Sequence, residues 1–203
     1  MPSTVASLFA ASGLVPADPV RWGEPVNENR PGVYAVALTA RVDEEADSVE
    51  RPAFSEARLQ ELLDRRPELR LDKTRRPSSA ELGERLAGFW LPDETVVYVG
   101  CTTRPLRTRT REYYGHRLGC NSPHKGGWPL KMLEFLDALW VHWAHALDPE
   151  QAERDMLDAF AAAVSQAAQS ELLVPEPLMP YANLRDGQRR RKRQGISRAT
   201  GPC

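Results

Sequence analysis

A run of seven residues, Gly32 to Leu38, is apolar along its whole length apart from one tyrosine hydroxyl. It is bounded by Pro31 and, a few residues later, by an acidic segment. A short apolar run between turn signals predicts a buried β-strand. Two more strands are expected, one over residues 95–100 and one over residues 139–147, where successive side chains alternate between two faces. The chain is therefore predicted to contain a small sheet.

Helical spacing of apolar residues accounts for much of the remaining chain. Ser78 stands three residues before Glu81, which is the capping-box pattern of a helix start. Thr103 and Asp148 are expected to cap two further helices. At 203 residues the chain has room for one domain. Helices are expected over residues 56–66, 80–90, 103–114, 129–135 and 148–169.

Charge is distributed very unevenly along the chain. The formal net charge is −1, which taken alone argues against a nucleic-acid partner. Residues 101–131, however, contain seven basic residues against one acid, and residues 185–198 again contain seven against one. Two basic blocks within a neutral protein indicate an anionic partner at one face. The alternative interpretation is a solvated charged surface followed by a disordered tail.

The sequence predicts a protein without a membrane span. No run of 18 or more apolar residues occurs, and the mildly apolar start lacks the basic segment of a secretory signal. Cys101, Cys120 and Cys203 are widely spaced and odd in number, so reduced thiols are expected instead of a disulfide scaffold. The expected location is the cytoplasm.

Two charged residues are predicted to lie on otherwise apolar helix faces. Glu153 falls within the apolar arc of the helix over residues 148–169. Arg109 shares a face with Leu106 and Tyr113. A buried carboxylate costs several kcal/mol unless it is paired or binds a metal. Glu153 and Arg109 are thus either partners of one another or a metal ligand and a phosphate clamp that face one pocket.

Five features follow one another along the chain: Gly32-Val33-Tyr34, Tyr98-Val99-Gly100, Arg109, Glu153 and Asn183. In this order they resemble the landmarks of the GIY-YIG nuclease superfamily. The resemblance implies an α+β fold, in which helices flank a small three-stranded antiparallel sheet, and a divalent-metal phosphodiesterase activity. Residues 40–94 would form a helical insertion between the first two strands. The predicted organisation is one GIY-YIG-like catalytic domain over residues 1–184, followed by a basic, disordered tail over residues 185–203.

The resemblance also implies a role for each landmark residue. Glu153 would hold one Mg²⁺ or Mn²⁺ ion, with water and phosphate oxygens as the remaining ligands. Arg109 would neutralise the charge that develops on the scissile phosphate. Tyr98, or Tyr34 beside it, would orient and deprotonate the attacking water. Asn183 would position the Glu153 region or the phosphate through hydrogen bonds.

The predicted partner is DNA, with RNA as a second possibility, and the sequence indicates no oligomeric state. His124, in a glycine-rich loop, is a candidate proton donor to the leaving group. Phosphate contacts are expected from nine residues of the two basic blocks: Arg104, Arg107, Arg111, Lys125, Arg189, Arg190, Arg191, Lys192 and Arg193.

Three departures from the family pattern support an alternative function. Cys101 stands where the family often has Lys or Ser, and Tyr113 stands where some members have His. The third departure is the insertion over residues 40–94. The alternative is a GIY-YIG-like module that binds nucleic acid or a partner protein without cutting. An enzyme that acts on another phosphorylated substrate is a third hypothesis.

Overall fold

The computed structural model describes residues 3–121 and 127–202. In this part of the chain, six α-helices are combined with an antiparallel sheet of four strands and a second sheet of two strands. The predicted α+β class is confirmed. The main sheet has the order β1-β5-β2-β4, one strand more than the three expected. The extra strand, β1 (Val20–Arg21), pairs with β5 at one edge and is too short to give an alternating pattern in the sequence.

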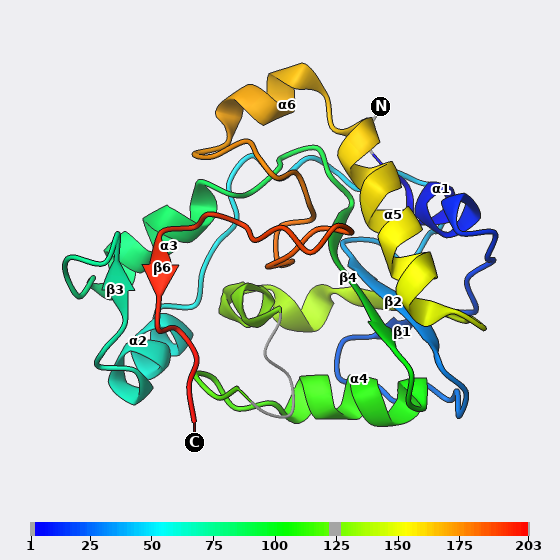
Figure 1. The fold of residues 1–203 in the computed structure, drawn as a ribbon, viewed down its shortest axis with the longest axis horizontal. Coiled ribbons are helices and arrows are strands. Elements are labelled where there is room, and N and C mark those ends of the chain that lie inside the picture. The colour runs from blue at the N-terminus through cyan, green and yellow to red at the C-terminus, as the bar shows by residue number, and fades with distance from the viewer. Residues whose placement is uncertain (1–2, 122–126, 203) are drawn as a thin grey trace.

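The apolar run that begins at Gly32 forms the central strand. This strand, β2 (Gly32–Ala37), is buried at every position and lies between β4 (Val96–Thr102) and β5 (Trp140–His145). Both faces of the sheet are covered (Figure 1). Helices α1 (Val5–Ala11) and α5 (Pro149–Ala163) pack on one face. The other face is covered by α4 (Leu106–Gly115) and by two short 3₁₀ helices, Trp128–Met132 and Leu136–Ala138.

Two predicted helix boundaries were wrong. The helix expected over residues 148–169 is divided into α5 and α6 (Gln166–Glu171). Val164 is extended at the break, and the Ser165 side chain caps α6 by accepting a hydrogen bond from the Ala168 amide. The basic helix begins at Leu106, after Pro105, so Thr103 is not its cap. The cap at Asp148 is confirmed, since its side chain accepts from the Gln151 amide at 3.0 Å.

The region over residues 40–94 contains the two expected helices, α2 (Glu56–Arg65) and α3 (Ser79–Ala87), and the capping box at Ser78 is confirmed. A two-residue strand between them, β3 (Arg70–Leu71), pairs with β6 (Ile196–Ser197) near the C-terminus. This pairing joins segments more than 100 residues apart in the sequence.

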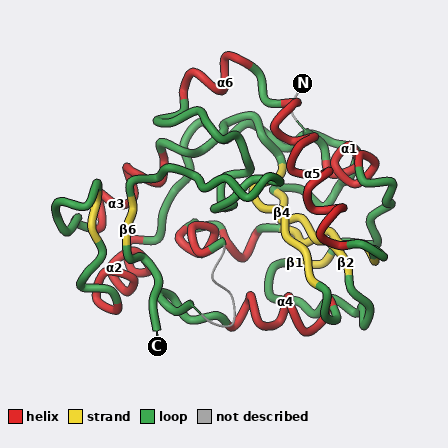
Figure 2. The backbone as a smooth tube through the Cα atoms, in the orientation of Figure 1, coloured by secondary structure: helices red, strands yellow, loops and turns green. Residues whose placement is uncertain are grey.

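Residues 185–202, called the C-terminal segment below, have the composition of a disordered tail. The structure instead gives them a definite course, mostly as loop, from the edge of the main sheet near β4 to β3 (Figures 1 and 2). Cys101 is a free thiol, but Cys120 is disulfide-bonded, so the expectation of reduced cysteines was wrong at this position. Within residues 3–121 and 127–202, no helix is long and apolar enough to cross a membrane.

Candidate functional site

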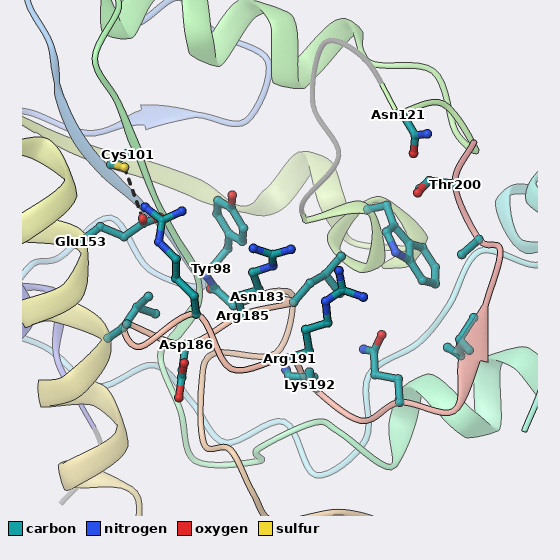
Figure 3. Close-up of a pocket in the computed structure, with 18 of the residues that line it drawn as sticks. Tyr98, Cys101, Asn121, Glu153, Asn183, Arg185, Asp186, Arg191, Lys192 and Thr200 are labelled. Carbon is teal, nitrogen blue, oxygen red and sulfur yellow. Dashed lines mark hydrogen bonds between the residues drawn. The ribbon is translucent and has the colours of Figure 1, made fainter. Parts of the chain in front are cut away.

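A pocket of about 920 Å³ lies along β4, the edge strand of the main sheet. Tyr98 and Cys101 line it from β4, Arg109 from α4, and Glu153 from α5. Residues 183–187, Arg189 and several later residues of the C-terminal segment form the facing wall (Figure 3). Because β4 is at the edge of the sheet, side chains from both faces of the sheet reach this one pocket.

Four of the five landmark residues therefore line a common pocket: Tyr98, Arg109, Glu153 and Asn183. The fifth, Tyr34, is 1% exposed and lies directly behind Tyr98, with the two ring centroids 5.9 Å apart. These residues come from four separate elements and a loop. Only the folded chain brings them together.

Glu153 is half-buried, in keeping with its position within the apolar arc of α5. Its Oε2 accepts a hydrogen bond of 3.2 Å from the Cys101 thiol. Burial raises the pKa of Glu153, while the hydrogen bond from Cys101 and the charge of Arg189 oppose that rise. The pKa of Cys101 is also raised, chiefly by burial, which keeps the thiol protonated and able to donate. Glu153 thus faces the pocket instead of a dry core.

Three tyrosines form a tight cluster at the back of the pocket. The ring centroid of Tyr113 lies 5.4 Å from that of Tyr98 and 6.4 Å from that of Tyr34. Burial raises the pKa of Tyr34 to about 12, despite the nearby charge of Arg109, and also raises the pKa of Tyr98 well above its usual value. Both phenols are therefore protonated at neutral pH, which argues against the expected role of either as the base that deprotonates water.

Asn183 binds the edge of β4 that pairs with no other strand of the main sheet. Its side chain is buried and accepts from the Val99 amide at 2.9 Å while donating to the Val99 carbonyl at 2.8 Å. Both backbone groups would otherwise be unpaired at a sheet edge. The Nζ of Lys192 in turn donates to the carbonyls of Pro180 and Tyr181, at 2.9 and 2.7 Å, just before Asn183. Asn183 thus positions the strand that carries Tyr98 and Cys101, and Lys192 holds the Asn183 loop.

The residues present fit a magnesium-type ion held partly by the substrate. Among the described residues, no group of three or more His, Cys, Asp and Glu side chains could enclose a metal. Mg²⁺, however, is commonly bound by one or two carboxylates together with water and phosphate oxygens. Glu150 lines the pocket one helical turn before Glu153, and its charge contributes to the raised pKa of Glu153. Two neighbouring carboxylates that face a pocket are a suitable oxygen donor set.

The nine residues expected to contact phosphate lie in different places. Arg189, Arg191 and Lys192 line the pocket. Five of the other six are described and do not line the pocket. Arg104 is ion-paired with Glu112, and Arg190 with Asp186. Arg107, Arg111 and Arg193 are exposed and do not line the pocket. Lys125, together with His124, lies outside the described residues.

Sequence reasoning missed several residues of the pocket. Glu150 could have been found, because a residue three positions before Glu153 shares its side of the helix. Arg154, Arg185 and Gln194 also line the pocket. Nothing in their local sequence indicates this, because their positions depend on where the C-terminal segment crosses α5 and β4.

Comparison of the chain with protein-family models, curated proteins and solved structures finds no match. Function is therefore inferred from the geometry and chemistry of the pocket.

Proposed function

We propose that this protein is a divalent-metal-dependent endonuclease of the GIY-YIG type, with the pocket along β4 as its active site and DNA as its substrate. One observation carries the proposal. Side chains singled out by their order in the sequence, Tyr98, Arg109, Glu153 and Asn183, come from distant parts of the chain and line one pocket. A chance resemblance gives no reason for such residues to meet.

The electrostatics of the pocket are those of a phosphate site. Of the described residues that line it, seven are Arg or Lys and three are acids. Arg109, which is only half-buried, presents a fixed fork of donors to the charge that develops on a phosphate in the transition state. Glu153, together with Glu150, would hold Mg²⁺ or Mn²⁺. When bound, that ion would supply Lewis-acid stabilisation of the phosphoryl oxygens.

The tyrosines act as hydrogen-bond donors in this scheme. Tyr98 lines the pocket, and the raised pKa values of Tyr98 and Tyr34 keep both phenols protonated at neutral pH. A protonated phenol orients a water or a phosphate oxygen but does not remove a proton from it. Asn183 contributes through its two hydrogen bonds to the backbone of Val99, which fix the edge of β4 and thereby position the neighbouring Tyr98.

The test is cleavage of plasmid DNA and of a labelled oligonucleotide in the presence of Mg²⁺ or Mn²⁺. We expect cleavage to stop in EDTA and to fall by at least about 100-fold in Glu153→Gln and Arg109→Ala, since removal of one group that stabilises the transition state costs roughly that much. Asp155→Asn is the matched control, because Asp155 is on the same helix but does not line the pocket. Undiminished cleavage by folded Glu153→Gln would remove the mechanism.

The contact between Cys101 and Glu153 favours a second candidate function. The Cys101 thiol already occupies one acceptor position of the carboxylate. In this reading the pocket binds nucleic acid without cutting it. Binding that persists in EDTA, with no product from a panel of DNA and RNA substrates, would favour this second function over the first.

A further inference from the structure

The pocket extends well beyond the catalytic end described above. Figure 3 shows Cys101 and Glu153 at one end, and Asn121 and Thr200 at the other. Arg185 and Arg191 lie between the two ends (Figure 3). A substrate that reaches from Glu153 to the far end therefore has to pass this pair of arginines.

The backbone holds Arg185 and Arg191 directly opposite one another. The two residues form an antiparallel bridge, so their side chains project from the same side of the chain. Both are exposed, and within the described residues neither forms an ion pair or a side-chain hydrogen bond. Like charges directly opposite are destabilising. The fold thus keeps two uncompensated cations together at the wall of the pocket.

The acid nearest in sequence does not neutralise this pair. Asp186 is 7% exposed and accepts hydrogen bonds from the backbone amides of Gln188 and Arg190 and from the Arg190 side chain. Its carboxylate therefore stabilises the turn between the two arginines. An anionic ligand is the natural partner for the pair.

A buried amide farther along the pocket also indicates a polar ligand. Gln194 is 5% exposed and lines the pocket, and its Nε2 has no hydrogen-bond partner among the described residues. Tyr98 and Trp128 contribute aromatic surface to the same pocket. Cationic groups combined with aromatic side chains are typical of sites for unpaired nucleic acid.

The pocket is limited in volume, and its walls are anchored. Its volume of about 920 Å³ is that of a small-ligand site, for which roughly 300–1,000 Å³ is usual. Lys192 anchors the C-terminal segment at one end. At the other end, β6 pairs with β3, and Arg85 binds the Gln194 carbonyl at 3.0 Å. This volume holds a few nucleotides, whereas a duplex brings two strands and their paired bases into the same space, so the pocket favours an unpaired strand.

We propose that the pocket takes an unpaired nucleic-acid strand, and that Arg185 and Arg191 form a phosphate-binding subsite for it, distinct from the Arg109–Glu153 end. This inference rests on the proposed function, because it takes the substrate to be a nucleic acid. It adds the substrate class: a single strand, or the unpaired part of a branched molecule. The region over residues 40–94 participates by anchoring the wall that carries the two arginines.

The experiment measures binding without cleavage. Fluorescence anisotropy of a labelled oligothymidylate is recorded in EDTA with Glu153→Gln protein, and then with the same protein carrying Arg185→Ala and Arg191→Ala. The matched control carries Arg41→Ala and Arg51→Ala, which remove the same charge from exposed positions outside the pocket. Circular dichroism verifies that each variant is folded.

We expect the single strand to bind more tightly than an oligo(dA)·oligo(dT) duplex of the same length. The Arg185/Arg191 double variant should bind the strand about tenfold more weakly, and its slope of log affinity against log salt should be flatter by about 1. The control should bind like its parent. Equal affinity for the single strand and the duplex would overturn the proposal that the substrate is unpaired. Unchanged affinity of the Arg185/Arg191 double variant would overturn the proposal that these two residues form a phosphate-binding subsite. If the unmutated protein binds the strand as expected but does not cleave it in the presence of metal, the proposed nuclease function is refuted and the proposed phosphate-binding subsite is retained.

Discussion

Gly100→Ala is a direct test of the packing that builds the site. A methyl group at this position would lie 2.8 Å from Cζ of Tyr34, 2.8 Å from Cε1 of Tyr98 and 2.9 Å from the Tyr34 hydroxyl oxygen. Both rings are almost fully buried and are packed against Tyr113, so neither can move away freely. Forcing an extra methyl into such a site costs about 1–3 kcal/mol. We expect the free energy of unfolding to fall by that amount.

The assay is equilibrium unfolding in urea, followed by circular dichroism, with near-ultraviolet spectra to detect displaced tyrosines. Gly115→Ala is the matched control, because an added methyl there has no atom within 4 Å and alanine is the better helix former. In a Tyr34→Leu background the cost of Gly100→Ala should shrink, since two of the three short contacts are with Tyr34. If Gly100→Ala unfolds within about 0.5 kcal/mol of the parent protein, the tyrosine cluster is not packed as described.

Three further outcomes are expected. Asn183→Ala should lower the free energy of unfolding by about 2–4 kcal/mol in a urea titration, because the Val99 amide and carbonyl both lose their partner. Burial raises the pKa of Glu94 from 4.5 to about 7, so the folded protein keeps this proton to a higher pH than the unfolded chain does. The free energy of unfolding should therefore fall by about 3 kcal/mol as pH rises from 4.5 to beyond 7. The variant Glu94→Gln should not show that fall. Arg85→Ala removes the bond to the Gln194 carbonyl, so trypsin should cut the C-terminal segment sooner, whereas global stability measured in urea should change little.

Several features could be predicted from the sequence because they depend on neighbouring residues. The strand that begins at Gly32, the capping box at Ser78 and the cap at Asp148 all follow from local spacing. The half-buried position of Glu153 followed from the periodicity of its helix. Four of the five landmark residues, which were chosen by their order along the chain, line one pocket in the structure. No local sequence pattern predicts that they lie close together.

Prediction of the elements failed in two places, once because the local signal was absent and once because it was misleading. The strand β1 is only two residues long, so it exists through its pairing with β5 and not through its own composition. The break between α5 and α6 occurs inside a continuous helical pattern. At that point the extended Val164 ends one helix, and the Ser165 side chain caps the next.

By itself, the sequence determined the central buried strand, most of the helices, and which side chains to examine for chemistry. Only the tertiary structure decided that residues 185–202 are a wall of the pocket, although their composition is that of a disordered tail. The physical reason is that their order comes from long-range contacts. Pairing of β6 with β3 and the bonds of Lys192 supply hydrogen-bond partners that offset the entropy of an otherwise flexible segment. Those partners come from distant parts of the chain, so no local pattern could reveal them.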